Sequence, residues 1–461
     1  MMTLQDVAFG GGREVESLHP EVTQDRRDEW ALMAATASGE SAVKTAGEKY
    51  LPKPSGYKAQ QDGGKAMYAA YRGRAQFPEI LTPSVSAMIG IIHGREIKIE
   101  MPDAMQSALW ENADGDGMPL EVFHRNITRN LLTYGRFGVL ADVPLAGGDP
   151  YLRGYAASAI TNWDRDWCVL DETAMARDGF KWKTVKRYRE LYLDGGAYAQ
   201  RLWTANEKGE YASEEIAVVA RGGAALTDVP FVVANAHDVS ATILTPPLIG
   251  VARSALAIYQ LSADYRHQLY MSGQETLVAL NGPAPTAVGA GVVHAMQGDG
   301  ISQPDLKYVS PSCSGIDAHL KAMEDNRIAA ITAGARLLEQ SDKVQESGEA
   351  RRLRFASETA TLSSIAMVSC ALLERSLRHA GAFMGLPPDG IIVTPPENLM
   401  DQTISAAEFA ALFGVYTQGG MSWPTLHAIG QKGGIFSADV DADAEYARIN
   451  PVTDNLDQNA A

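Results

Sequence analysis

The sequence predicts an α+β fold that is mainly α-helical, and three features of the 461-residue chain indicate it. Apolar residues at i, i+3 and i+4 dominate residues 65–140, which is typical of amphipathic helices. Alternation of apolar and polar residues takes over in residues 151–234, where DGG and NEKGE supply turns. Long helical patterns then fill much of residues 245–384. A chain of this length exceeds one ordinary core, so two or three compact regions are expected.

The first half of the chain is expected to hold a polar arm and a mixed region. Residues 1–63 are polar and glycine-rich, with a short helical stretch at residues 28–36, and we expect an N-terminal arm. Residues 64–244 follow as an α/β region and an antiparallel sheet. Helical segments include GKAMYAAYRGR and PLEVFHRNITRNLLTYG, and strands include RFGVLADVP, WCVLDET and DVPFVVAN.

A long helix is expected over residues 245–273, with Thr245 as a candidate N-cap and Gly273 at its end. Apolar residues recur along it in steps of three and four and form one continuous seam on a helix of roughly 40 Å. A helix this long needs neighbours along its length. The seam residues expected to pack are Leu248, Val251, Ile258, Tyr265 and Leu269.

A small insert, residues 274–313, separates this helix from a second one. Its segments ETLVALNG and LKYVSPS are predicted strands, joined by irregular chain rich in glycine and proline. The second helix is expected over residues 314–338. Ile316, Leu320 and Met323 are among the residues predicted to lie on its packing side.

A polar segment, EQSDKVQESGEARR, occupies residues 339–352 and is predicted to be a charged loop. Taken alone it is also compatible with an ordinary solvated surface loop. A long helix over residues 353–384 follows, rich in Ala, Ser and Thr as close-packed helices are. Residues 385–461 are expected to add a short C-terminal helical region.

Cysteine usage and hydropathy exclude several classes of protein. Cys168, Cys313 and Cys370 lack CxxC spacing, which disfavours a disulfide framework or a zinc site and favours small buried thiols. No basic flank followed by an apolar run opens the sequence, so no secretory signal is expected. The run 359–373 is shorter than the roughly 20 residues that a bilayer requires, and the run 276–298 contains prolines and glycines, so no membrane partner is expected.

No catalytic, cofactor-binding or metal-binding residue is predicted, and we do not expect an enzyme. The histidines lack the spacing of metal ligands, and neither GxxxxGK[ST] nor GxSxG occurs. The acidic run containing Asp114, Asp116 and Glu121 lacks the ligand spacing of a calcium loop. It is predicted to be a turn between helices.

The charge balance bears on nucleic acid. A net charge of −16 disfavours a protein that grips DNA, because such affinity comes from Lys and Arg that displace counterions from phosphates. The same balance suits a surface past which a hydrated duplex must move.

The order of helix, glycine- and proline-rich β insert, helix, polar loop and long small-residue helix resembles that of tailed-bacteriophage portal proteins. DVPFVVANAHD and PPLIGVARSALAIYQLSADYRHQLYMSGQETLVALNG are similar to the portal pattern of a strand, a first stem helix and the strand that follows. GESAVKTAGEKYLPKP, YGRFGVLADVP, AITNW and GGMSWPTLHAIGQKGGIF are similar to a branch of portal-like sequences formerly without assigned function. The resemblance spans about residues 28–450 and depends on the collinear order of weakly specific motifs.

The resemblance implies a portal fold. In that fold residues 1–63 are the N-terminal arm and residues 64–244 the wing. The stem helices are residues 245–273 and 314–338, with the clip at residues 274–313 between them. The tunnel loop is residues 339–352, the long kinked helix residues 353–384, and the C-terminal wing or reduced crown residues 385–461.

The resemblance also implies a function. Portal proteins form a ring, usually of twelve subunits, at one capsid vertex of the virion, and double-stranded DNA is packaged and ejected through it. The implied partners are further copies of the chain, double-stranded DNA, terminase, a head–tail adaptor and the major capsid protein, with assembly in the host cytoplasm. The implied DNA-channel residues are Gln340, Asp342, Lys343, Gln345, Glu346, Arg351 and Arg352.

Two alternatives remain open at this point. Another phage structural protein, such as a scaffold or an adaptor, would need long helices but not the β insert between them. An uncharacterised hydrolase would need a site built from residues without a motif. Arg351 and Arg352 either face DNA or pair with acidic residues of a neighbouring subunit.

Overall fold

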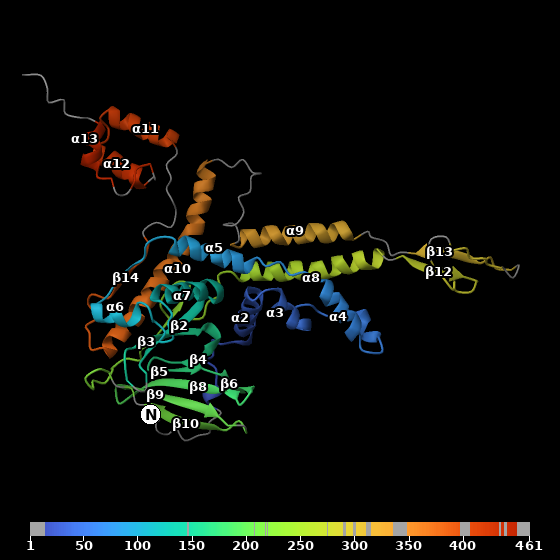
Figure 1. Ribbon diagram of the computed structural model, residues 1–461, viewed down its shortest axis with the longest axis horizontal. Coiled ribbons are helices and arrows are strands. Elements are labelled where there is room, and N and C mark those ends of the chain that lie inside the picture. Colours follow the sequence, from blue (N-terminus) through green and yellow to red (C-terminus); the bar gives the residue numbers. More distant parts are fainter. Residues whose placement is uncertain are drawn as a thin grey trace, which may run out of the picture. The chain divides into compact units, whose positions relative to one another are not determined.

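The computed structural model describes residues 14–144, 147–206, 208–216, 218, 220–273, 275–288, 292–297, 301–309, 315–334, 348–396, 406–432, 435–437 and 440–449. It divides into two units, Met1–Pro395 and Pro396–Ala461. The fold is α+β with helices in the majority, as the sequence predicts (Figure 1).

A three-stranded antiparallel sheet forms the centre of the first unit. β2 (Arg136–Asp142) lies between β11 (Phe231–Asn235) and β3 (Tyr151–Ala156), and every residue of β2 is buried. α7 (Leu120–Tyr134) leads directly into β2 through Gly135, whose φ of 69° favours glycine at this helix end. α7 and α10 (Gly348–Phe383) both pack on β2, so the sheet is covered by helices (Figure 1).

A five-stranded antiparallel sheet follows in the sequence, in the order β10-β9-β8-β5-β4. Its strands are β4 (Ile160–Trp163), β5 (Trp167–Asp171), β8 (Arg187–Asp194), β9 (Ala197–Ala205) and β10 (Tyr211–Ile216), and η4 (Ala157–Ala159) leads into it. β6 (Ala174–Asp178) and β7 (Lys181–Val185) form a separate two-stranded ribbon. The alternating pattern of residues 151–234 therefore corresponds to strands, as predicted.

A buried ionic network joins the two sheets. The Arg189 guanidinium on β8 donates to Glu172 (Nε to Oε1, 2.8 Å), to Asp142 at the end of β2 (Nη1 to Oδ2, 3.2 Å) and to Gln200 (Nη1 to Oε1, 2.6 Å). The Tyr155 hydroxyl donates to Glu172 at 2.6 Å. Burial alone would raise the pKa of Glu172, but the charge and hydrogen bonds of Arg189, together with Tyr155, hold it below its usual range.

The N-terminal stretch differs from the expected arm, because the residues described from Glu14 onward pack on the first unit. It contains η1 (Glu14–Glu16), α2 (Gln24–Ala37), α3 (Glu40–Thr45), η2 (Gly47–Lys49) and η3 (Ser55–Ala59). The helices α4 (Lys65–Arg74) and α5 (Leu81–His93) follow it. Trp30 on α2 is buried with Val22, Ala157 and Ile243, and its indole Nε1 donates to the carbonyl of Tyr134 at 3.2 Å. Because the stretch is polar overall, its composition did not indicate that a few aromatic residues such as Trp30 are buried.

The residues that follow α10, up to Pro395, still belong to the first unit. β14 (Ile392–Thr394) pairs with β1 (Lys98–Glu100), and the backbone N–H of Val393 donates to Glu374 at 2.9 Å. The region expected over residues 385–461 is therefore split at residue 395. Within the second unit, α11 (Ala406–Thr417), α12 (Trp423–Lys432) and α13 (Ala442–Ile449) surround an aromatic cluster in which His427 stacks on Phe436.

Three expectations from the sequence can be checked within the described residues. Cys168 and Cys370 are buried free thiols, and burial raises the pKa of each to about 12, whereas Cys313 lies outside the described residues. The acidic run joins α6 (Asp103–Leu109) to α7, where Asp114 Oδ1 accepts the backbone N–H groups of Asp116 and Met118 at 2.9 and 3.0 Å. Of the helices in the described ranges, none has the length and apolarity needed to cross a bilayer.

Candidate functional site: a helical arm with a β-hairpin tip

The helical arm, residues 249–334, projects from the first unit (Figure 1). It consists of α8 (Ile249–Ser272), β12 (Thr276–Leu280), β13 (Asp305–Val309) and α9 (Ile316–Thr332). At 1.5 Å per residue, α8 is roughly 36 Å long. α9 runs back along α8, and the β12–β13 hairpin lies beyond the far ends of both helices.

The arm begins later than the predicted cap. α8 starts at Ile249, and Leu248 occupies the N-cap position without a side-chain cap hydrogen bond. The hydroxyl of Thr245 instead accepts a hydrogen bond from Arg26 Nη1 at 2.9 Å. Pro246 and Pro247 form the turn before the helix, since the N–H of Ile249 donates to the Pro246 carbonyl at 3.1 Å. The capping hydroxyl is thus used to join α2 to the base of the arm.

α8 and α9 approach closely at both ends of their contact. A Cβ placed on Gly250 would lie 2.9 Å from the Cβ of Ala333, and one on Gly315 would lie 3.1 Å from Nε2 of Gln268. Gly250 and Gln268 are separated by about five helical turns and therefore lie on one face of α8. Small residues at these points let the two backbones run close and antiparallel.

The opposite face of α8 is held by residues 50–77. Tyr259 lies about two and a half turns from Gly250 and packs edge-to-face on Phe77 with ring centroids 6.1 Å apart. The Ser262 hydroxyl accepts the N–H of Gln76 at 3.0 Å, and the Tyr71 hydroxyl donates to Asp264 at 2.6 Å. Burial raises the pKa of Tyr71, and its bond to Asp264 adds to this, so the phenol stays protonated.

His267 lies inside this contact. Arg74 has only donors, so its Nη2, 3.1 Å away, makes Nδ1 of His267 an acceptor, and the ring proton resides on Nε2, 3.3 Å from the Tyr57 hydroxyl. Burial, and then the charge of Arg74, lowers the pKa of His267. His267 is half-buried and clamps η3 and α4 to α8.

Packing loosens from the base of the arm to its tip. Leu248 and Val251 are buried inside the chain, where a Cβ on Gly334 would lie 2.9 Å from Leu248 Cδ2 and 3.9 Å from Val251 Cγ2. The other predicted packing residues are not enclosed: Ile258, Tyr265, Ile316 and Met323 are half-buried, and Leu269 and Leu320 are exposed.

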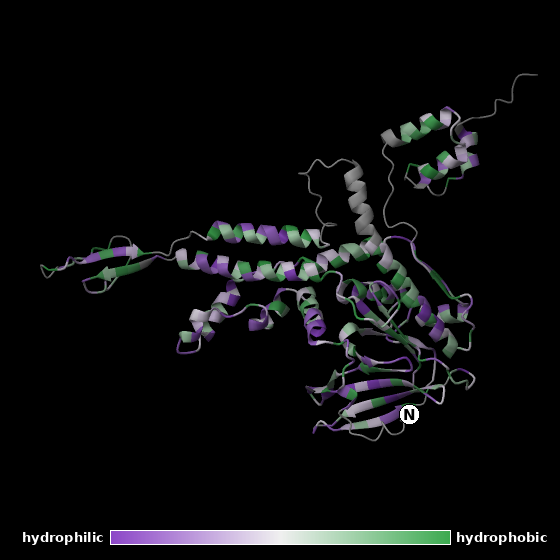
Figure 2. Cartoon of the chain, turned by 180° about the vertical axis from the view of Figure 1, so that it is seen from behind, coloured by the Kyte–Doolittle hydropathy of each residue, from purple (hydrophilic) through white to green (hydrophobic). Residues whose placement is uncertain are grey.

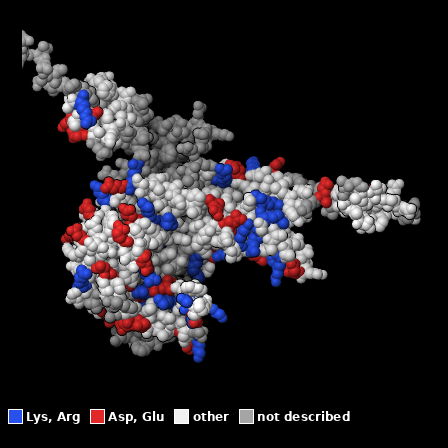
Figure 3. Space-filling view, viewed as in Figure 1, with Lys and Arg blue, Asp and Glu red and all other residues white. Residues whose placement is uncertain are grey.

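The tip of the arm is a small β hairpin that exposes apolar side chains. β12 and β13 pair only with each other among the described strands, from Thr276 opposite Val309 to Leu280 opposite Asp305. A two-stranded hairpin is marginally stable alone, and its open edges invite pairing. Val293 is 90% exposed and Ile301 is 96% exposed. Figure 2 colours both ends of the tip partly as hydrophobic, and Figure 3 shows few charged residues on its visible face. Such a surface is typical of a protein contact site.

The expected channel loop is only partly described. Gln340, Asp342, Lys343, Gln345 and Glu346 lie outside the described residues. Arg351 and Arg352 belong to α10, which begins at Gly348 instead of at residue 353. The run EARRLR consists of good helix formers, so the helix extends past the boundary that polarity alone indicated.

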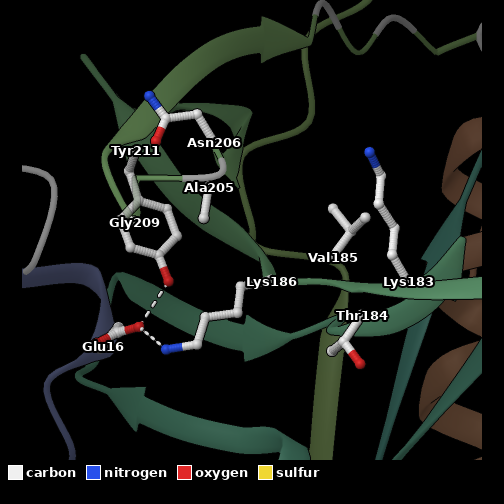
Figure 4. Close-up of a pocket in the computed structure, with 9 residues that line it drawn as sticks. All are labelled: Glu16, Lys183, Thr184, Val185, Lys186, Ala205, Asn206, Gly209 and Tyr211. Carbon is white, nitrogen blue, oxygen red and sulfur yellow. Dashed lines mark hydrogen bonds and ion pairs between the residues drawn. The ribbon is translucent and has the colours of Figure 1, made fainter.

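A pocket of about 760 Å³ lies on the five-stranded sheet, and no sequence motif indicated it (Figure 4). At its edge the Glu16 carboxylate accepts from Lys186 Nζ and from the Tyr211 hydroxyl, both at 2.7 Å. These bonds fasten η1 to the sheet. Within the described part of the chain, no group of three or more His, Cys, Asp or Glu could hold a metal ion. The contacts of Glu16 at the edge of this pocket therefore have a structural role.

Comparison with known proteins gives three findings. The model of a family described as "Domain of unknown function (DUF4055)" matches residues 247–384, which include the arm and α10. No curated protein matches the chain. Among solved structures, the chain is similar to one described as "Neck of native GTA particle computed with C12 symmetry", at 13% identity and a TM-score of 0.40, covering 76% of this chain and 89% of that chain. A second, "Neck of empty GTA particle computed with C6 symmetry", has 14% identity and a TM-score of 0.39, covering 85% and 98%.

Proposed function

We propose that the chain is a structural protein of the head–tail junction of a tailed-bacteriophage particle, and specifically its portal protein. In this role it forms a ring at one vertex, usually of twelve copies, through which double-stranded DNA is packaged and ejected. The observation that carries the proposal is the arm: two long antiparallel helices that end in an exposed β hairpin and lead on to a third long helix.

The arm supports ring formation through its exposed apolar surface. One helix pair cannot enclose the side chains of Leu269, Leu320 and Ile328, and each of these is exposed in the single chain. Repeated copies arranged around an axis would cover them, because a heterologous contact closes into a ring when the rotation between copies closes. In this assignment α8 and α9 are the stem, and the hairpin is the core of the clip.

The remaining segments take their roles from the same assignment. The sheets with α7 form the wing, residues 339–352 the tunnel loop, and the second unit the reduced crown. The clip, residues 274–313, docks terminase and the head–tail adaptor, and the wing faces the major capsid protein. The net charge of −16 suits a conduit, because a wall that neutralised many phosphates would retain DNA with high, salt-dependent affinity.

Deletion of part of the tunnel loop tests the proposal. We expect that a chain lacking residues 343–347, which leaves α10 intact from Gly348, assembles like the wild type but packages or retains less DNA. The measurement is DNA protected from nuclease in particles made with each chain. The control replaces the same five residues by Gly and Ser, which keeps the length and removes the charges.

The two variants separate the possible roles of the loop. A defect in the deletion alone would assign the role to the length of the loop, and a defect in both to its charged side chains. Unchanged DNA content in both would contradict a channel-lining loop, and loss of assembly in the deletion would place the segment at a subunit contact.

A separate experiment tests where the protein lies in the particle. Particles are labelled with an antibody against the second unit, and we expect label at one vertex per particle. Label spread through the head interior would favour a scaffold.

A further inference from the structure

Two unlike surfaces flank the arm. On one side lies the basic lobe, which we define as residues 40–79; it contains seven Lys or Arg against four Asp or Glu, in a chain whose net charge is −16. On the other side lies α9. Figures 1 and 2 both place α9 on one side of α8 and α4 on the other, in agreement with the opposite faces of α8 that contact them.

Some lysines of the basic lobe form ion pairs within the chain, and others do not. Lys44, Lys49 and Lys53 pair with Glu40, Asp28 and Glu48. Lys58 and Lys65 are exposed and form no ion pair with any described residue. α4 turns Tyr68 and Tyr71 inward, and Lys65 and Met67 are exposed on different sides of this helix. The exposed surface of the lobe therefore carries positive charge that is not paired within the described part of the chain.

The outward face of α9 has the complementary character. Ala330 is the buried residue of this helix, and the positions opposite it carry Asp317, Glu324 and Asp325, with Lys321 as the single base. All four are exposed. Ile328 lies on the same face and is 53% exposed, although it is a large apolar side chain. This face therefore has a net negative charge and an uncovered apolar centre.

The two surfaces lie at the same level of the arm. Gly315 lies beside Gln268 and Ala333 beside Gly250, so the antiparallel register brings residues 316–323 of α9 level with residues 260–267 of α8. The basic lobe grips this part of α8, since Gln260 donates to the Tyr50 carbonyl at 2.8 Å and the Tyr57 hydroxyl lies 3.3 Å from Nε2 of His267. Lys58 follows Tyr57 in the chain and therefore lies level with Asp317. Rotation from one copy to the next about an axis along the arm can therefore bring one surface against the other without a shift along it.

We propose that the outward face of α9 in one copy packs against the basic lobe of the next copy, with Asp317 facing Lys58 and Lys65 and with Glu324 two turns further along the same face. Ile328 is then covered by the neighbouring lobe. The inference rests on the proposed ring and adds the pair of surfaces that closes it. A second copy fits better than DNA, because the exposed apolar centre of α9 matches a protein contact and its acidic residues would repel phosphates.

Charge reversal in two separate chains tests the pairing. One variant carries Lys58→Glu and Lys65→Glu, and the other carries Asp317→Lys and Glu324→Lys. In each variant alone every contact would pair like charges, so at low salt we expect the concentration needed for assembly to rise by about tenfold or more. In an equimolar mixture the variants can alternate around the ring, and every contact again pairs opposite charges. Native mass spectrometry of the mixture should show rings with equal numbers of the two chains.

The controls keep this test separate from the proposed function. Lys181→Glu with Arg187→Glu makes the same change of charge at exposed positions of the wing and should assemble like the wild type. Circular dichroism and thermal unfolding establish that each variant is folded. If the wild type forms rings and each variant alone assembles equally well, the proposed pairing is wrong but the proposed ring stands. The same holds if the two variants, once mixed, do not regain assembly. Absence of rings in the wild type would overturn both.

Discussion

The sheets of the wing and the helical arm differ in which side chains they bury and which they expose. In the wing, even the charged residues Arg189, Glu172 and Asp142 are buried and bonded to one another. In the arm, large apolar residues such as Ile301 and Ile328 are left exposed. The charged groups between the two sheets are therefore satisfied within one chain, although the β6–β7 ribbon exposes Phe180 and Trp182. The outer arm leaves large apolar side chains uncovered along its length. In the proposed ring, this difference would place the stability of the single chain in the sheets and the contacts between copies in the arm.

The comparison also holds within the arm. Leu248 and Val251 at its base are buried against the first unit, and residues 260–267 are held by the basic lobe. Towards Leu269 and the β12–β13 hairpin this support ends. The base of the arm is therefore packed within the chain, whereas its outer half is uncovered in the single chain.

The largest expected effect comes from breaking the wing network. Arg189→Met removes the cation between two buried carboxylates, and the uncompensated charges should lower the free energy of unfolding by about 3–5 kcal/mol. Urea denaturation of the single chain measures this. Arg187→Met on the same strand is the matched control, because Arg187 is exposed and should change the free energy by less than about 0.5 kcal/mol. Equal effects of the two substitutions would contradict the role of the network.

Acid should weaken the wing through a buried histidine pair. His93 and His124 meet with ring centroids 4.9 Å apart where α5, α7 and α10 join, and His124 Nε2 lies 3.2 Å from the Ser369 hydroxyl. Burial lowers the pKa of His93 to about 4, with the charge of Arg125 adding to it, and lowers that of His124 to about 3, with His93 adding to it. Both rings are therefore neutral in the folded chain at neutral pH.

The sign of the pH dependence follows from these values. The unfolded chain takes up protons on both histidines below a pKa of about 6.5, while the folded chain does not until near pH 4 and 3. The free energy of unfolding should be at its full value above pH 6.5 and fall steadily as the pH drops to 5. Urea midpoints across this range should depend less on pH in the His93→Gln, His124→Gln double variant. The same slope in wild type and variant would exclude the pair as the cause.

The smallest expected effect on the single chain comes from the exposed face of the arm. Ile328→Ser should change the free energy of unfolding by less than about 0.5 kcal/mol and yet weaken assembly. Leu248→Ala at the buried base should instead cost about 2 kcal/mol or more. Denaturation and sedimentation of both variants make the comparison. If Ile328→Ser destabilises the chain as much as Leu248→Ala does, the outer arm is packed within the chain.

The sequence predicted the arm better than the parts that hold it. Regular periodicity marked α8 and α9, and a glycine- and proline-rich interval flanked by apolar runs marked the hairpin. The clamp on α8 was missed because Tyr57, Tyr71 and Arg74 are about two hundred residues distant in sequence from their partners and follow no local pattern. Thr245 resembled a helix cap because its competing donor, Arg26, is equally remote. Long-range polar contacts of this kind leave no periodic signal.

Electron microscopy of the purified full-length chain tests the central claim most directly, namely that the arm is completed by further copies of the chain. Closed rings are expected, with the arms of neighbouring copies side by side around a central channel and the α9 face covered. Only monomers or open filaments at every concentration and salt condition tried, or rings in which the outer arms contact no neighbour, would contradict it.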